Sequence, residues 1–195
     1  MRCIDPITIK NPYLKEPRPH VEYEPPKLSV PCGKCGACLH RRQSDWQFRL
    51  TNEDLSATNS FFITLTYQDV YSEALGGYMT PTTLDKKHLQ DFFKRVRKQS
   101  QPFYDQRPDI WPKTTRFRYY AVGEYGTITE RPHYHVIAFN IPEAIIQQIR
   151  QGKIWDYGLT HVGGVSPKSI AYVTRYVVTS REETKKKRLY LSSVL

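Results

Sequence analysis

The sequence lacks an apolar run long enough to cross a membrane, and its N-terminus lacks the apolar stretch of a signal peptide. We therefore expect a protein without a membrane span that is made and used in a cytoplasm. Acidic residues are also few, with 19 Asp and Glu against 29 Lys and Arg, which gives a formal net charge of +10. This excess of positive charge predicts a polyanionic partner, most simply nucleic acid.

Cysteine is scarce and is confined to the start of the chain. The four cysteines are Cys3, Cys32, Cys35 and Cys38. In a reducing compartment such a cluster favours a metal over disulfides, and zinc takes four thiolate or imidazole ligands in a closed, structural site. Cys3 is the natural fourth ligand, with His20 and His40 as substitutes. Free thiols, or a pair of disulfides in an oxidising compartment, are the alternatives.

Proline divides the chain unevenly. Seven of the 14 prolines lie between Pro6 and Pro31, which excludes a long helix there. We expect residues 1–40 to form an extended, proline-rich arm that the cysteine site pins at both ends. Residues 41–180 would form the main domain, and residues 181–195 a mobile basic tail.

The main domain alternates helical and strand patterns. Loops are predicted over 68–81 and 101–115, where glycine and proline gather. Helices are predicted over about 40–56, 82–100, 142–150 and 166–177, and strands over 61–67, 116–124, 132–140 and 158–165. This order predicts an α+β fold with a mainly antiparallel central sheet of about four to five strands and helices packed on it.

A histidine pair offers a candidate metal site. His133 and His135 are two residues apart in a predicted strand, so their imidazoles lie on one face of the sheet. Glu124 ends the preceding strand, and a hairpin would bring its carboxylate beside them. These three side chains could hold a cation with open coordination positions. The alternative is a pair of packing or hydrogen-bonding histidines.

Two tyrosines offer candidate nucleophiles. Tyr172 and Tyr176 are four residues apart and share one face of the last predicted helix. Such a pair is also common in amphipathic packing. Beside a divalent metal that polarises a phosphodiester, however, a phenol could attack phosphorus and form a covalent phosphotyrosine.

These motifs together resemble a known superfamily. The His133–His135 segment fits the His–hydrophobic–His signature of HUH endonucleases. Other matching segments are Phe62–Tyr67, which resembles their first motif, and Ala171–Val177, which resembles the two-tyrosine motif of phage rolling-circle initiators. With Val30–Cys35, Cys38, Tyr120–Gly126 and Arg131–His135, the ordered set is similar to replication initiators of gokushovirus-like microviruses, which are single-stranded DNA phages.

The resemblance implies a fold and an activity. The sheet would be a ferredoxin- or RRM-like HUH palm, and Mg²⁺ or Mn²⁺ would be bound by Glu124, His133 and His135. Tyr172 or Tyr176 would take the 5′ phosphate at a phage origin and free a 3′-OH for a host polymerase. The second tyrosine would later close the unit-length strand. Partners would be single-stranded origin DNA and a host helicase and polymerase, in the bacterial cytoplasm.

The DNA contacts are predicted from basic residues near these elements. The candidates are Lys94, Arg97, Lys98, Lys168 and Arg175. A solvated, inert face is the alternative for the first three. Three other functions stay open: a different HUH enzyme such as a plasmid initiator or transposase, a non-catalytic zinc-stabilised protein that binds single strands, and a zinc hydrolase.

Overall fold

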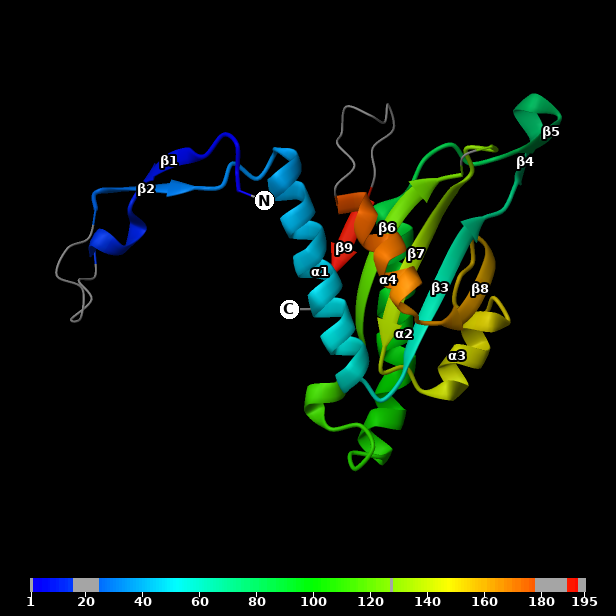
Figure 1. The fold of residues 1–195 in the computed structure, drawn as a ribbon. Helices are drawn as coiled ribbons and strands as arrows, with labels where there is room; N and C mark the ends of the chain where they lie inside the picture. Colours follow the sequence, from blue (N-terminus) through cyan, green and yellow to red (C-terminus); the bar gives the residue numbers. More distant parts are fainter. Residues whose placement is uncertain (1, 16–24, 127, 178–188, 193–195) are drawn as a thin grey trace.

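The computed structural model describes residues 2–15, 25–126, 128–177 and 189–192. A five-stranded sheet with the order β8-β3-β7-β6-β9 forms the centre of the described structure (Figure 1), and every neighbouring pair is antiparallel. Its strands are β3 (Ser60–Tyr67), β6 (Arg118–Tyr125), β7 (Pro132–Phe139), β8 (Gly158–Gly164) and β9 (Leu189–Ser192). The predicted α+β fold with a mainly antiparallel sheet is confirmed.

Helices cover both faces of the sheet (Figure 1). The helices α2 (Lys86–Gln106) and α3 (Glu143–Arg150) pack on one face, where their side chains share a core with Leu65 of β3. The helices α1 (Gly36–Ser56) and α4 (Pro167–Thr174) pack on the other. None of the helices among the described residues combines the length and the apolar character needed to cross a lipid bilayer.

Strand alternation places a polar patch on the face that carries α1 and α4. Ile137 and Phe139 of β7 belong to the core beneath these helices. Because side chains alternate along a strand, His133 and His135 point to the same side but lie beyond the end of this apolar cluster. The sheet therefore presents two imidazoles next to α4.

The start of α4 follows the predicted signal. Ser166 is the N-cap, Pro167 is the first helical residue, and Ser166 and Ser169 satisfy each other's backbone amides in a reciprocal capping box. These contacts fix where the helix begins and hence where its tyrosines lie. The end differs from the prediction, because the α-helix stops at Thr174 and continues as one 3-10 turn, η4 (Arg175–Val177).

The segment predicted as a loop over 68–81 contains a short hairpin. It pairs β4 (Val70–Ser72) with β5 (Gly77–Met79) through the 3-10 turn η2 (Glu73–Leu75). Gly76 adopts a left-handed φ of 62°, which lets the chain reverse. Tyr71 and Tyr78 are opposite each other and pack edge to face. The glycines that suggested a loop are instead the turn of this hairpin.

The prediction that α2 would end before residue 101 is wrong. The helix runs through Pro102 to Gln106. Tyr104 is buried against Trp111 and donates a hydrogen bond of 2.6 Å to the carbonyl of Asn140. This packing offsets the one backbone hydrogen bond that proline removes.

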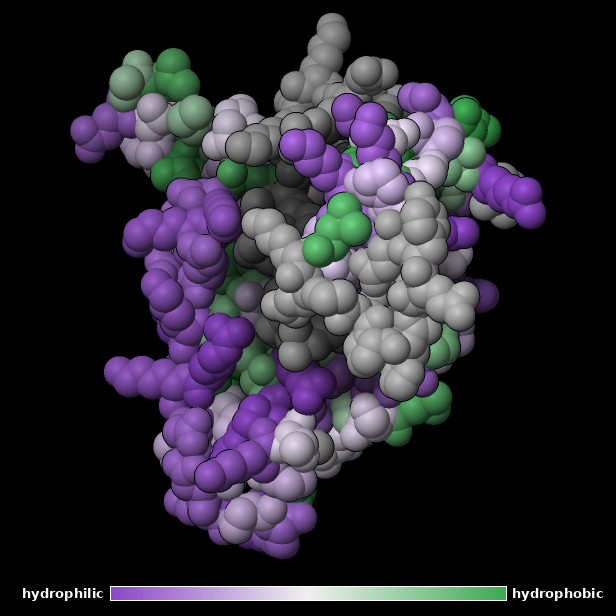
Figure 2. All heavy atoms as spheres, turned by 90° about the vertical axis from the view of Figure 1, so that its left-hand side faces the viewer, coloured by the Kyte–Doolittle hydropathy of each residue, from purple (hydrophilic) through white to green (hydrophobic). Residues whose placement is uncertain are grey.

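The N-terminal arm has more structure than an extended chain. The strands β1 (Ile7–Lys10) and β2 (Lys27–Val30) form an antiparallel ribbon, with η1 (Pro12–Lys15) after β1. The ribbon projects from the body beyond the start of α1 (Figure 1). Because α1 begins at Gly36, four residues earlier than predicted, it crosses the expected boundary at 40/41. Hydrophilic side chains dominate the side of the molecule on which α1 lies (Figure 2).

Part of the predicted C-terminal tail is a strand. Leu189–Ser192 forms β9 at the sheet edge and pairs with Tyr120–Gly123 of β6. An edge strand without a neighbour leaves backbone groups unpaired, and β9 satisfies those of β6. The basic run 185–188, predicted as a mobile tail, lies outside the described residues.

Candidate active site and metal centres

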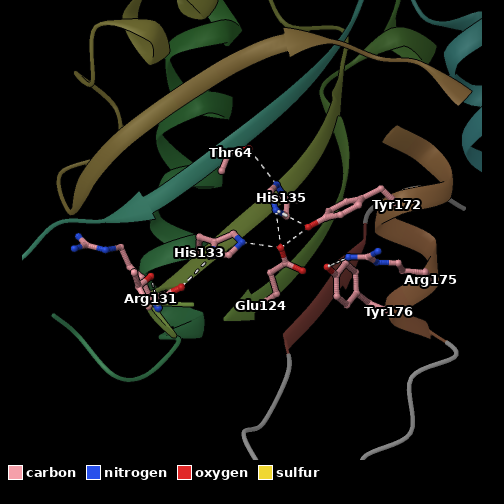
Figure 3. Close-up of polar contacts among 9 residues, drawn as sticks. Thr64, Glu124, Arg131, His133, His135, Tyr172, Arg175 and Tyr176 are labelled. Atoms are coloured by element: carbon pink, nitrogen blue, oxygen red, sulfur yellow. Dashed lines mark hydrogen bonds and ion pairs between the residues drawn. The ribbon is translucent and has the colours of Figure 1, made fainter. Parts of the chain in front are cut away.

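The carboxylate of Glu124 joins the two histidines. In the antiparallel register of β6 and β7, Glu124 is directly opposite His133. Oε1 of Glu124 lies 2.7 Å from Nε2 of His133 and 2.9 Å from Nε2 of His135 (Figure 3). The three ligand atoms all lie within 4.8 Å of one another. The structure therefore brings together the three residues that the sequence predicted as a cation site.

Two further groups orient the imidazoles. Nδ1–H of His133 donates to the carbonyl of Arg131 over 3.0 Å, and Nδ1 of His135 lies 3.0 Å from the hydroxyl of Thr64. Both rings thus turn Nε2 toward Glu124 (Figure 3). Partners on the far nitrogen of a metal-binding histidine fix its orientation and tautomer. The sequence analysis missed both partners, although Thr64 is opposite His135 in the β3–β7 register.

The site is largely shielded from solvent, and its ionisation reflects this. Burial alone would raise the pKa of Glu124, but hydrogen bonds from His133, His135 and Tyr172 outweigh burial and hold this pKa well below its usual value. Burial alone would lower the pKa of His133, yet the hydrogen bonds to Glu124 and to the Arg131 carbonyl raise it. The metal-free site therefore contains a carboxylate that stabilises an imidazolium.

The donor set fits a divalent cation. Two imidazole nitrogens and a carboxylate oxygen suit a metal of intermediate hardness, and three protein ligands leave coordination positions open. An open position is what a substrate phosphate or a water would need. These residues could thus serve a reaction at the metal and not only a structural role.

Tyr172 completes the group from α4. Its phenolic hydroxyl donates to Oε1 of Glu124 over 2.5 Å and lies 3.5 Å from Nε2 of His135 (Figure 3). Burial and the negative charge of Glu124 raise the pKa of Tyr172 to about 12. A phenol thus faces the candidate cation site, as the sequence analysis expected of this helix.

Tyr176 occupies a different position. It belongs to η4, its ring lies 5.6 Å from that of Tyr172, and its hydroxyl accepts a hydrogen bond of 2.9 Å from Arg175. The guanidinium of Arg175 lies 4.3 Å from the ring centre of Tyr172 and 5.1 Å from that of Tyr176. The sequence predicted two equivalent phenols, but a carboxylate binds one and a guanidinium binds the other (Figure 3).

The four cysteines also meet. Their sulfur atoms all lie within 4.8 Å of one another, with 3.9 Å between Cys35 and Cys3 and 4.0 Å between Cys32 and Cys38. A tetrahedral zinc site with Zn–S bonds of about 2.3 Å places its sulfurs about 3.8 Å apart, whereas a disulfide needs about 2.05 Å. The cysteines are unbridged and have the spacing of metal ligands.

Backbone geometry prepares this cluster for thiolates. Gly33 has a left-handed φ of 74° and lets the chain turn between Cys32 and Cys35. Backbone amides point at the sulfurs, and those of Ile4 and Cys38 lower the pKa of Cys35 to about 6. Cys3 is the fourth member of the group, as predicted; His20, one proposed substitute, lies outside the described residues.

The predicted DNA contacts fall into two groups. Lys168 and Arg175 lie on α4 and η4, near Tyr172. Lys94, Arg97 and Lys98 lie on α2, which covers the opposite face of the sheet (Figure 1). Lys94 forms an ion pair with Asp91. The α2 residues are therefore not brought together with the candidate site.

Sequence comparison relates the chain to replication-associated proteins. Its relatives include Replication-associated protein ORF2 of Spiroplasma virus 4, 33% identical over 165 residues, and Replication-associated protein ORF4 of Chlamydia phage 1, 27% identical over 165 residues. Replication-associated protein VP4 of Bdellovibrio phage phiMH2K is 26% identical over 162 residues. Each alignment covers 76% of this chain but only 47%, 37% and 48% of these relatives, so the chain spans about half of their length or less.

The match includes the candidate site. The family model of Replication-associated protein ORF2 matches residues 60–181, which is more than half of the chain and contains Glu124, both histidines and both tyrosines. No solved structure matches the chain. The chain therefore belongs to the Replication-associated protein ORF2 family.

Proposed function

We propose that this chain nicks and rejoins single-stranded DNA through metal-assisted attack by tyrosine, as a rolling-circle replication initiator of the HUH type. The observation that carries the proposal is the hydroxyl of Tyr172, 2.5 Å from Glu124 and 3.5 Å from His135. A buried carboxylate, two oriented imidazoles and a phenol on one spot suit phosphoryl transfer better than packing. The relatives named as phage replication-associated proteins support the biological setting.

The reaction exchanges one phosphodiester bond for another. The phenolic oxygen of Tyr172 forms a bond to the phosphorus, and the bond from phosphorus to the 3′ oxygen breaks. The phenol loses its proton, and the leaving 3′ oxygen gains one, so that a 5′-phosphotyrosine and a 3′-OH result. The energy of the phosphodiester is retained in the covalent intermediate, and a later attack by a 3′-OH or a second phenol can rejoin the strand.

Each residue has a defined part in this scheme. Glu124, His133 and His135 would hold Mg²⁺ or Mn²⁺, which polarises the scissile phosphate and stabilises its developing charge. Thr64 and the carbonyl of Arg131 keep the imidazoles in position. Arg175 lies over the ring of Tyr172, where its positive charge can stabilise the phenolate and the phosphate that joins it.

The two tyrosines have unequal roles in the first step. Tyr172 points at the three ligands, while the hydroxyl of Tyr176 is bonded to Arg175. We assign the first attack to Tyr172 and the later transfer to Tyr176. The change of roles requires the hydrogen bond between Arg175 and Tyr176 to open.

The remaining parts of the proposal concern the setting of this activity. The four cysteines would bind zinc, which suits thiolates, so two different metals would be present in one chain. The antiparallel sheet with its ligands on β6 and β7 would be an HUH palm. Origin DNA and the host helicase and polymerase would be the partners, in the bacterial cytoplasm.

A covalent-adduct assay tests the proposal. The chain is incubated with Mn²⁺ and labelled single-stranded oligonucleotides tiled across the replicon that encodes it, and is then run on a denaturing gel. We expect one oligonucleotide to give a protein–DNA band that resists denaturation. Tyr172→Phe should abolish this band, and Tyr176→Phe should retain it but lose strand joining.

Tyr78→Phe serves as the matched control, because Tyr78 is an exposed tyrosine on the β4–β5 hairpin. It should behave like the unmodified protein. Binding of oligonucleotides without any adduct would contradict the enzyme and support a non-catalytic single-strand-binding protein. An adduct that persists in Tyr172→Phe would contradict the assignment of the first attack.

A further inference from the structure

We propose that a cationic cavity on the sheet face opposite the candidate active site binds a backbone phosphate of single-stranded DNA. The cavity has a volume of about 420 Å³. It lies between the C-terminal half of α2, the turn η3 (Lys113–Thr115) and the residues that lead into β6. Its lining residues are Arg97, Gln101, Tyr104, Lys113, Arg116 and Phe117.

Three of these six residues are cations, and they come from three separate parts of the chain. Arg97 lies on α2, Lys113 on η3, and Arg116 just before β6. Like charges repel when they converge, so a concave site that collects them favours an anion. Arg97 was predicted from sequence as a DNA contact, whereas Lys113 and Arg116 fell in a segment predicted as a loop and at the start of the next strand.

The charge of Arg116 is only loosely balanced within the protein. Its nearest carboxylate contact is Asp105, at 3.7 Å from Nη2, and Asp105 also accepts a 2.7 Å hydrogen bond from Gln101. Nη1 of Arg116 is buried and has no hydrogen-bond partner in the part of the chain that the structure describes. A half-buried guanidinium with an unmade hydrogen bond is costly unless an anion compensates it.

Aromatic rings hold both guanidinium groups in place. Arg97 lies over Phe117 and Tyr119, at 5.5 and 5.4 Å from the ring centres, and Arg116 lies 4.8 Å from the ring of Tyr104. Stacking on a ring fixes the plane of an arginine, so it loses less entropy when it binds a phosphate. Cations mixed with aromatic side chains are typical of grooves that follow single-stranded nucleic acid.

This site goes beyond the proposed nicking activity, because α2 and the three ligands lie on opposite faces of the sheet. It would hold a part of the DNA that is not being cut. A polynucleotide is favoured over a free nucleotide because the chain carries a formal net charge of +10 and a long polyanion can use charge across its surface. The chemistry at the cavity itself is that of a phosphate oxygen.

Fluorescence anisotropy tests the site without cleavage. The probe is a labelled oligothymidylate of about 15 nucleotides, in buffer without added divalent metal. We expect Lys113→Gln, Arg97→Gln and Arg116→Gln each to weaken binding about 3- to 10-fold and to lower the slope of log K against log salt by about 0.7 to 1. Arg107→Gln is the control, since it removes an exposed arginine that lies outside the cavity and is paired with Asp109.

The design separates the possible ligands. Thymidine 5′-monophosphate, used as a competitor, should displace the oligonucleotide only at concentrations about 100-fold or more above the oligonucleotide's Kd, because it offers one phosphate. Competition at concentrations near that Kd would overturn the proposal in favour of a free-nucleotide site. Equal behaviour of the cavity variants and Arg107→Gln would overturn it outright. If Arg116→Gln fails to fold, the exposed Lys113 and Arg97 give the same test.

Discussion

The phenolic hydroxyl of Tyr172 and Oε1 of Glu124 lie 2.5 Å apart, although 48 residues separate them in the chain. The same carboxylate oxygen also contacts Nε2 of His133 and of His135. In the metal-free site a single oxygen thus gathers three hydrogen-bond partners. A cation bound there would take the place of protons and would leave the phenol beside an electrophilic centre.

Glu124→Gln should separate metal binding from folding. The amide has nearly the same shape as the carboxylate but carries no charge, so we expect Mn²⁺ affinity to fall by about 10- to 100-fold. Thermal stability should change much less than after Glu124→Ala. Isothermal titration calorimetry measures the affinity, and Glu73→Gln, at an exposed site, is the control. Unchanged Mn²⁺ affinity would remove Glu124 from the ligand set.

Thr64→Val should weaken the site from outside. It preserves the side-chain volume and removes the hydroxyl that lies 3.0 Å from Nδ1 of His135. A freed imidazole loses its fixed orientation, so we expect Mn²⁺ affinity to fall by about 10-fold. Thr82→Val, at an exposed position, should leave the affinity unchanged. Equal affinities in both variants would show that Thr64 plays no positioning role.

Local rules were enough to predict much of the candidate site. The two-residue period of a strand put His133 and His135 on one face, and a hairpin brought Glu124 opposite them. Ser166 and Pro167 fixed the start of α4, and therefore the turn on which Tyr172 lies. These are short-range relations, which a single sequence contains.

Other features depend on contacts between distant segments. The equivalence of Tyr172 and Tyr176 failed because the helix changes to a 3-10 turn at Arg175, where Arg175 binds the second phenol. The extension of α2 through Pro102 depends on the burial of Tyr104 beneath Asn140, 36 residues away. The cationic cavity needs three segments to meet, and no local pattern contains that information.

The pKa shifts predict how pH acts on the site. The pKa of His133 is raised, so this imidazole stays protonated to higher pH, and a metal ligand must be neutral. Mn²⁺ affinity should therefore fall as the pH is lowered from about 8 to about 6. Calorimetry at several pH values measures this. A pH-independent affinity would contradict the role of His133 as a ligand.

In the metal-free protein the sign is reversed for the same histidine. Its raised pKa contributes stability that is fully present below its ordinary value of 6.5 and is lost as the pH rises through the folded value. The lowered pKa of Glu124 contributes stability that is present above 4.5 and is lost as the pH falls through the folded value. The pair should therefore stabilise the metal-free protein most between these two values.

The cysteine cluster should hold one zinc ion per chain. Elemental analysis of purified protein should give a zinc-to-protein ratio of about one, because four thiolates form a closed tetrahedral site. Cys35→Ser should lose the metal and loosen the arm, since its thiol has a pKa lowered to about 6 and is the readiest to ionise. His40→Ala, which removes a histidine outside the cluster, should keep the metal. Zinc loss in His40→Ala would contradict the four-cysteine assignment.

The identity of the residue that becomes linked to DNA tests the central claim most directly. A single-stranded substrate with sulfur in place of the bridging 3′ oxygen would trap the intermediate, because the released thiol rejoins poorly. After digestion, mass spectrometry should find the nucleotide adduct on the peptide that contains Tyr172, as a phosphotyrosine. An adduct confined to any other residue, or strand cleavage with no adduct at all, would contradict the account.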